Sequence, residues 1–305
     1  MNRTAKEYAL ISLKGIAMGA ADVIPGVSGG TIAFITGIYE ELITSIGNIN
    51  FGLVKTFKSH GVKAFWQQLN GNFLLALLIG IGISVFSLMR VAHYLIEEHP
   101  IKIWSFFFGL VIASVWFIGK QISKITLANV FIFVIGALIA FGVTKITPAQ
   151  GTTNELYLLL CGALAVCAMI LPGISGAFIL LLLGAYQTIS EAVSSFNFKT
   201  IALVGLGAII GLLSFSKLLK WLFKHYKDLT LALLSGFILG SLNKIWPWKE
   251  VLKTKVIKDK TIVLAEQSIW PNQFEGENHF WLAMGLMLIG FISIIILEKI
   301  GESNN

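Results

Sequence analysis

The stretch ADVIPGVSGGTIAFITGIY, residues 21–39, decides how this chain folds. It returns in altered form as AMILPGISGAFILLLLGAY at residues 168–186. The Pro-Gly pair, the Ser-Gly pair and the final Gly-x-Tyr keep their places in both copies. The chain therefore contains an internal repeat, with one copy in each half.

Each copy contains a Pro-Gly pair that interrupts a helix. Proline has no amide donor, and its ring clashes with the preceding helical turn. The serine three residues after each proline is suited to cap a new helix of about three turns, because its hydroxyl accepts a hydrogen bond from a first-turn amide. We therefore expect helix breaks at Pro25 and Gly26 and again at Pro172 and Gly173.

The helical run that precedes each break is short. From Gly15 to Pro25 it spans only about 16 Å at 1.5 Å per residue, roughly half of a 30 Å hydrocarbon core. Non-helical backbone at membrane depth is tolerated only where protein buries it or where it lines a cavity. The two copies therefore predict re-entrant helical hairpins at residues 15–46 and 156–193.

Composition indicates a membrane protein. Of the 305 residues, 56% are hydrophobic and 13% are charged, whereas a soluble domain carries roughly 25% charged residues. The mean hydropathy is +0.81. The net charge of +7 comes from an excess of basic residues. Basic residues beside apolar spans gather on the cytoplasmic side, so their positions indicate the orientation of the chain in the bilayer. We expect an integral protein whose partner is the bilayer, with no nucleic-acid partner.

Six apolar stretches follow the hairpins and are long enough to cross a bilayer. They are residues 73–96, 103–118 and 127–143 after the first hairpin, and residues 201–223, 229–245 and 280–297 after the second. These stretches predict an all-α polytopic membrane protein, a single membrane domain over residues 1–305. It contains two repeats, residues 1–150 and 151–305, each made of one re-entrant hairpin and three transmembrane helices.

The number of crossings predicts how the repeats are related. A hairpin that returns to its own side, followed by three crossings, delivers the second copy to the opposite face of the membrane. We therefore expect inverted repeats whose two broken tips meet near the midplane, as in many transporters.

Lysine and arginine positions predict the orientation. With both termini inside, the short outer loops hold few basic residues: Lys102, Lys145 and Lys199. The exception is the lysine-rich segment 244–279, which this topology places outside. Its residues 255–264 suggest a small β-hairpin. The small number of basic residues in the short outer loops predicts a multi-pass protein with both termini inside, an N-in/C-in topology.

The candidate binding residues start the second helix of each hairpin: Ser28, Gly29, Gly30 and Thr31 in the first copy, and Ser175 and Gly176 in the second. Free amides and the positive end of the helix dipole favour an anion there, and glycine allows it to approach the backbone. The alternative is that these small residues only permit close helix packing. Nothing in the sequence indicates a metal ion or a cofactor.

Two ionisable residues have ambiguous roles. Asp22 precedes the first break, and Met169 occupies its place in the second copy. It either couples transport to a proton or cation, or bonds nearby amides of the broken tip. Arg90 shares a helix face with His93 and Glu97. It either snorkels to the outer interface or receives an anionic head group at the outer mouth.

The four residues Gly26-Val27-Ser28-Gly29 also match the G-x-S-G pattern of intramembrane serine proteases. Such an enzyme needs a histidine within hydrogen-bond reach of the serine. Of the five histidines only His93 falls inside a predicted span, near its outer end. We therefore expect no enzymatic activity. An intramembrane serine hydrolase is the less favoured alternative.

The first copy, followed by Glu40, resembles the signature of the bacterial polyprenyl-phosphate transporter family, long known only as a domain of unknown function. Residues 171–176 resemble the second signature of that family. The resemblance implies a flippase in the bacterial inner (cytoplasmic) membrane. Its lipid would be undecaprenyl phosphate, carried from the outer to the inner leaflet for reuse in cell-envelope glycan synthesis. The segment 244–279 does not match the family pattern.

The residues alone leave the ligand open. Composition and spacing do not distinguish a lipid phosphate from a free anion, so a small-anion channel or transporter for chloride or phosphate remains an alternative. A lateral opening beside the tips would favour the lipid, a sealed aqueous pore would favour the ion, and a close Ser–His pair would favour the hydrolase.

Overall fold

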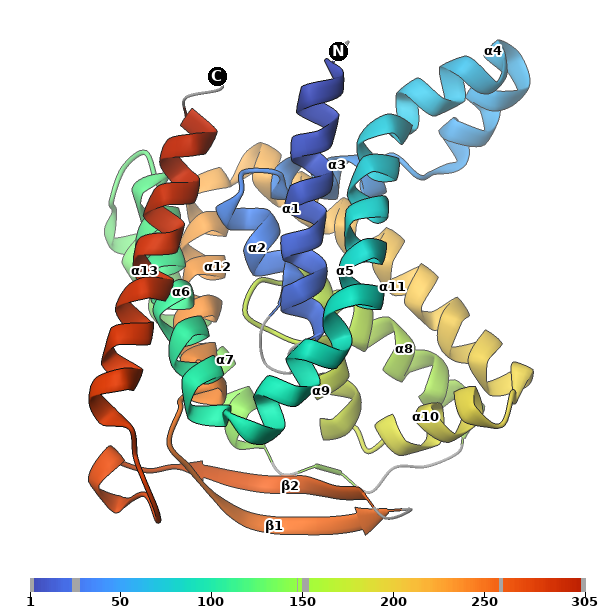
Figure 1. Ribbon diagram of the computed structural model, residues 1–305. Helices are drawn as coiled ribbons and strands as arrows, with labels where there is room; N and C mark the ends of the chain where they lie inside the picture. Colours follow the sequence, from blue (N-terminus) through green and yellow to red (C-terminus); the bar gives the residue numbers. More distant parts are fainter. Residues whose placement is uncertain (1–2, 24–27, 147, 150–153, 258–259, 303–305) are drawn as a thin grey trace.

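The computed structural model describes residues 3–23, 28–146, 148–149, 154–257 and 260–302, and they form helices with one two-stranded sheet (Figure 1). The elements follow in this order: α1 (Ala5–Val23), α2 (Gly29–Ile35), α3 (Tyr39–Gly47), α4 (Phe51–Leu69), α5 (Gly71–Glu98), α6 (Pro100–Lys120), α7 (Leu127–Lys145), α8 (Glu155–Ile170), α9 (Gly176–Leu182), α10 (Tyr186–Ser194), α11 (Phe198–His225), α12 (Lys227–Ser241), η1 (Leu242–Ile245), β1 (Lys249–Ile257), β2 (Lys260–Ser268), η2 (Pro271–Gln273) and α13 (Phe280–Glu302).

The helix before the first break is longer than predicted. Helix α1 has 19 residues, about 28 Å at 1.5 Å per residue, so the expected half-length limb that starts at residue 15 is wrong. The cause is a capping box: the amide of Glu7 donates to Thr4 Oγ1 (3.3 Å), and the amide of Thr4 donates to Glu7 Oε2 (2.6 Å). In the second half, α8 has 16 residues and starts behind the side-chain cap of Asn154.

The returning limb of each hairpin is also different from the prediction. A single helix of about three turns is wrong, because a glycine with positive φ ends the run after two turns in both copies: Gly37 (φ +72°) and Gly184 (φ +65°). A second short helix follows each glycine, and α9 and α10 are bent by 111°. Each copy therefore consists of one long helix and two short ones.

The predicted spans coincide with helices. Within the described residues, five helical segments are long and apolar enough to cross a membrane: α5, α6, α7, α11, and α12 together with η1. The bent pair α9 and α10 makes a sixth if it counts as one span, and α8 and the described part of α13 are shorter apolar helices. The fold class of an all-α polytopic membrane protein is confirmed.

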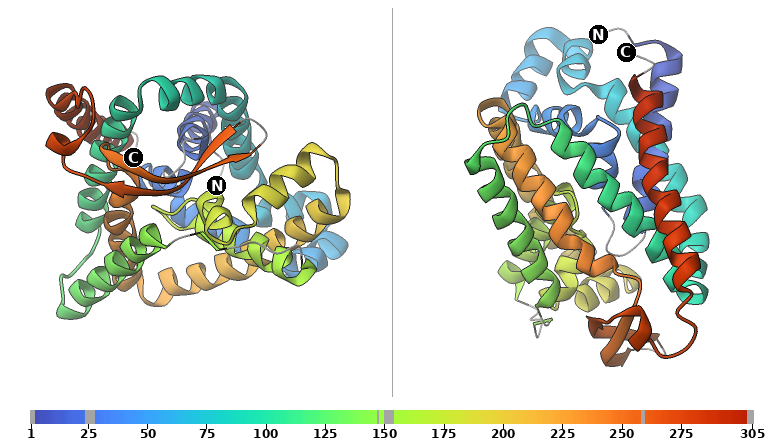
Figure 2. Two further views of the ribbon diagram at one scale, coloured as in Figure 1. Left: turned by 90° about the horizontal axis from the view of Figure 1, so that it is seen from below. Right: turned by 90° about the vertical axis from the view of Figure 1, so that its left-hand side faces the viewer.

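The long helices pack in pairs. Helix α1 lies along α5 and α8 along α11, whereas α6 pairs with α13 and α7 with α12, which joins elements distant in the sequence (Figures 1 and 2). Glycine allows the close crossings. A Cβ on Gly80 would lie 2.0 Å from the carbonyl oxygen of Ser12, and one on Gly207 would lie 1.9 Å from that of Leu159.

The sheet lies across one end of the helical bundle. Helix α1 begins and α13 ends at the opposite end (Figure 1). Strands β1 and β2 pair antiparallel, with Lys249 opposite Ser268 and Val251 opposite Glu266. The suggested hairpin at residues 255–264 is confirmed, with longer strands than expected. Its base is fixed by buried Trp248, whose Nε1 donates to the carbonyl of Asn278 (2.8 Å).

Candidate functional site

The two copies of the repeat, residues 21–39 and 168–186, each contain a helix break, and these two broken segments meet inside the bundle. The hydroxyl of Thr31 accepts a hydrogen bond from the amide of Gly173 (2.9 Å), and the hydroxyl of Ser28 donates to the carbonyl of Leu171 (3.3 Å). A Cβ on Gly30 would lie 2.7 Å from the carbonyl oxygen of Ile170. The first turn of α2 therefore packs directly on the second break. Of the predicted break residues, Pro25 and Gly26 lie outside the described part of the chain.

The start of α2 is already occupied by side chains of the same hairpin. Asp22 Oδ1 accepts a hydrogen bond from the amide of Gly29 (2.7 Å), and the Ser28 hydroxyl accepts one from the amide of Gly30 (3.1 Å). Helix α2 is buried along its whole length. Asp22 thus bonds one amide of the broken tip, that of Gly29, which agrees with one of the two roles that its position allowed.

The start of α9 is different. Ser175 makes no side-chain cap, and Leu182 is the buried residue of this helix. A small cavity of about 10 Å³, room for about one water molecule, lies beside it. Gly173, Ser175 and Lys244 are among the residues that line this cavity. The two equivalent helix starts are therefore in different states: an internal carboxylate caps the first, and the second faces a cavity.

Arg90 belongs to α5, but its side chain and that of His93 lie outside the described part of the structure. Its role as a head-group ligand stays a prediction. Ser28 would be the nucleophile of the hydrolase alternative. The hydrogen bonds of its hydroxyl are made with backbone atoms of Met169, Leu171 and Gly30. Among the residues that the structure describes, no group of three His, Cys, Asp or Glu side chains could hold a metal ion.

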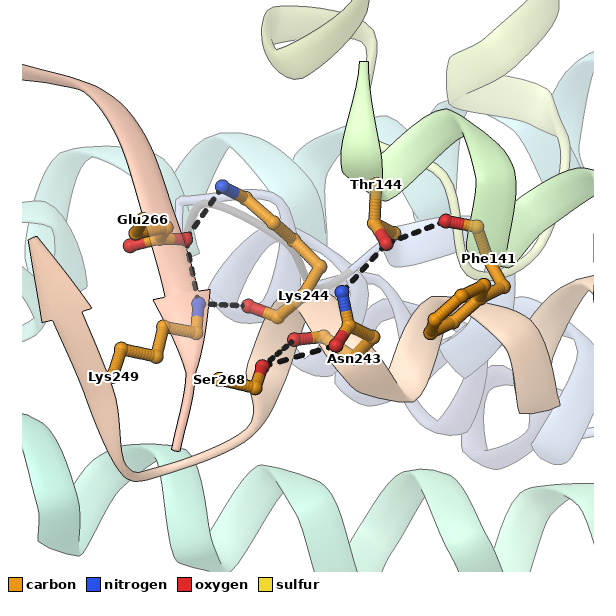
Figure 3. Close-up of polar contacts among 7 residues, drawn as sticks. All are labelled: Phe141, Thr144, Asn243, Lys244, Lys249, Glu266 and Ser268. Carbon is orange, nitrogen blue, oxygen red and sulfur yellow. Dashed lines mark hydrogen bonds and ion pairs between the residues drawn. The ribbon is translucent and has the colours of Figure 1, made fainter. Parts of the chain in front are cut away.

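A charged cluster at the base of the β-hairpin of β1 and β2 was not predicted from the sequence (Figure 3). Glu266 Oε1 lies 2.8 Å from Lys244 Nζ and 2.7 Å from Lys249 Nζ. Beside it, Asn243 Nδ2 donates to Thr144 Oγ1 (2.7 Å) and the Ser268 hydroxyl donates to Asn243 Oδ1 (3.0 Å). These contacts attach the hairpin to the end of α7. The lysines stood out in the sequence, but their shared carboxylate depends on the strand register.

The chain matches the sequence model of the VCA0040-like family, described as undecaprenyl phosphate translocase-like, over residues 18–263. It belongs to this family. The family match covers both broken segments and most of the β-hairpin, and it ends before Glu266 and Ser268.

Two relatives extend the comparison over nearly the whole chain. The "Polyprenyl-phosphate transporter" of Vibrio cholerae serotype O1 is 45% identical over 300 residues, 97% of each chain. A protein of the same name from Staphylococcus aureus is 34% identical over 310 residues, 96% of each chain. No solved structure matches. The names of these family members indicate transporters rather than enzymes.

Proposed function

We propose that this chain transports polyprenyl phosphate, moving undecaprenyl phosphate from the outer to the inner leaflet of the bacterial inner membrane for reuse in envelope glycan synthesis. Membership of a translocase-like family supports the substrate class. The observation that carries the mechanism is the direct contact between the two broken segments, through Thr31 with Gly173 and Ser28 with Leu171. A head group at this contact is reachable from either half.

We propose that residues 1–150 and 151–305 are inverted repeats in an N-in/C-in topology. The helix pairs support this relation: α1 on α5 corresponds to α8 on α11, and α6 on α13 corresponds to α12 on α7. Under this topology the hairpin of β1 and β2 faces the outside. If the two halves rock about the contact between the broken segments, a head group bound at that contact would face each leaflet in turn.

The head group is held by the two helix starts, Ser28, Gly29, Gly30 and Thr31 with Ser175 and Gly176. A phosphate alone in hydrocarbon would have a desolvation cost of many kcal/mol, and two dipole ends of about half a charge each offset part of it. Asp22 Oδ1 accepts a hydrogen bond from the first of these amides, that of Gly29. An arriving phosphate displaces its carboxylate, which then takes up the coupling proton. Arg90 attracts the head group at the outer mouth.

A leaflet assay tests the function. Liposomes containing only this protein are loaded with polyprenyl phosphate in one leaflet, and a non-permeant phosphatase reports how much of the lipid remains accessible. We expect the accessible fraction to fall with protein present. Chloride or phosphate flux without lipid movement would support the small-anion alternative, and cleavage of a membrane substrate would support the hydrolase.

One matched pair of variants links the assay to the site. Gly30→Ala places a methyl group against the carbonyl of Ile170, and it should separate the segments and slow lipid movement at least tenfold. The control is Gly82→Ala in α5, where an added Cβ meets nothing within 4 Å. Equal rates for both variants would show that the contact between the segments is not the transport site.

A further inference from the structure

A cavity of about 260 Å³, the hairpin cavity, lies between the β-hairpin of β1 and β2 and the ends of α7 and α9. One part of its lining is polar or charged, and it includes Lys145, Lys244, Glu266 and Gln267. The other part is apolar and includes Ile146, Phe178, Leu181, Leu182, Leu252 and Val263. The cavity is therefore amphipathic, with charged groups beside a surface that suits a hydrocarbon chain.

The charges around Glu266, which lines this cavity, are not balanced: Lys244 also lines the cavity, whereas Lys249 is not part of the lining and reaches Glu266 from beside it. Glu266 is the shared partner of two ammonium groups, and the side chains of Lys249, Lys244 and Glu266 are only 13%, 24% and 25% exposed. The pKa of Lys249 is lowered to about 8, mainly by burial and also by Lys244, while Glu266 opposes the shift. Burial alone would raise the pKa of Glu266, but the two lysines hold it below its usual range. The trio thus carries an uncompensated positive charge, which an anion would neutralise.

Lys244 connects the hairpin cavity to the broken segments. Its side chain lines this cavity and also the small cavity that contains Gly173 and Ser175. The ammonium nitrogen lies 4.6 Å from the ring centroid of Phe178, in cation–π contact. A lysine head on a flexible four-carbon stem can exchange one anionic partner for another without a backbone movement.

We propose that Lys244 and Lys249 form a binding site for the phosphate monoester of a lipid, in which Glu266 is the resident anion that the phosphate replaces. The apolar part of the lining then holds the first isoprenoid units of the chain. Figure 3 shows both ammonium groups directed at the one Glu266 carboxylate that a phosphate would displace. Binding at this site stands by itself, and only onward passage to Ser175 rests on the proposed function.

Binding to the purified full-length protein in nanodiscs tests the site. The probes are a short-chain polyprenyl phosphate, the matching polyprenol without phosphate, and inorganic phosphate. Lys244→Met should weaken binding of the lipid phosphate about tenfold, since a charge-assisted hydrogen bond is lost, and should leave the polyprenol unchanged. Lys199→Met is the control, because Lys199 pairs with Glu155 on the protein surface away from the cavity.

A second variant separates binding from misfolding. Glu266→Gln removes the competing carboxylate and keeps the side-chain size, so it should tighten binding of the lipid phosphate several-fold at about pH 6.5, well below the pKa of about 8 that Lys249 has beside Glu266. A damaged fold would not give tighter binding. Unchanged affinity in both Lys244→Met and Glu266→Gln would overturn the proposal. Inorganic phosphate binding as tightly as the lipid would overturn the lipid assignment.

The two proposals can fail separately. If the lysine and glutamate variants change phosphate binding as expected but the wild-type protein moves no lipid in liposomes, the binding site stands and the flippase does not. If Lys244→Met and Glu266→Gln both bind lipid phosphate with wild-type affinity and move it at the wild-type rate, the flippase stands and this site is wrong.

Discussion

The hydroxyl oxygen of Thr31 lies 2.9 Å from the amide nitrogen of Gly173, and this hydrogen bond joins the first turn of α2 to the second helix break. Thr31 is only 1% exposed, and the two residues are 142 positions apart in the chain. A buried donor that loses its acceptor carries its full desolvation cost. The bond is thus a sensitive reporter of whether the two segments work as one site.

Thr31→Val should destabilise the protein by about 1–3 kcal/mol, because it keeps the shape and leaves the Gly173 amide without its acceptor. Thr31→Ser keeps the hydroxyl and is the control. Thermal unfolding in detergent measures the stability, and the liposome assay measures transport. Equal stability of the valine and serine variants would mean that the two segments separate at no cost.

Asp22→Asn tests whether the carboxylate only caps α2 or also carries a proton. Asparagine still offers an oxygen to the Gly29 amide, so the fold should persist. Transport should lose its dependence on a proton gradient, whereas Asp22→Ala should also lower the thermal stability. A gradient-driven rate that is unchanged in Asp22→Asn would leave Asp22 as a cap alone.

The inverted topology is tested by labelling single cysteines in a background without Cys161 and Cys167. Lys58→Cys lies in α4, at the end of the molecule where α1 begins (Figure 1), and Lys199→Cys lies in the first turn of α11. A membrane-impermeant maleimide should reach the first position from the inside and the second from the outside. Labelling of both positions from one side would exclude the topology.

Arg90 is expected to act through its charge at the outer mouth. Arg90→Lys should retain part of the transport rate, whereas Arg90→Met should lose most of it at normal expression, because only the lysine still attracts an anion. Initial rates in the liposome assay at several lipid concentrations measure the effect. Near-wild-type rates for both variants would make Arg90 a plain interfacial anchor.

The hairpin site should depend on pH through Lys249. Its pKa is lowered to about 8, so the ammonium group loses its proton as the pH rises through about 8, and affinity for the lipid phosphate should fall there. The phosphate itself contributes little to this change, because its second pKa is about 6. Glu266 and Lys244 are the charged groups that act on Lys249. Lys249→Arg should remove the fall; a fall that persists would assign the titration to another group.

Several features of the fold could be predicted because their causes are local. Apolar length sets where α5, α6, α7, α11 and α12 cross, and the Pro-Gly pairs with their following serines set where α2 and α9 begin. The hairpin follows from β-branched residues around a polar turn. Where the local prediction is wrong, the cause is still local: the Thr4–Glu7 capping box lengthens α1, and Gly37 with its positive φ ends α2.

The sequence by itself determined the membrane class, the duplicated breaks and the helical segments, because these depend on hydrophobicity and on the backbone limits of proline and glycine. Only the tertiary structure decided which groups meet. The cap of Asp22 on Gly29, the bond between Thr31 and Gly173, and the sharing of Glu266 by Lys244 and Lys249 join residues of two successive helices, of the two halves, or of a strand pair and the helix before it. Such contacts depend on how helices and strands pack, since a carboxylate pairs with whichever donor the packing brings within about 3 Å.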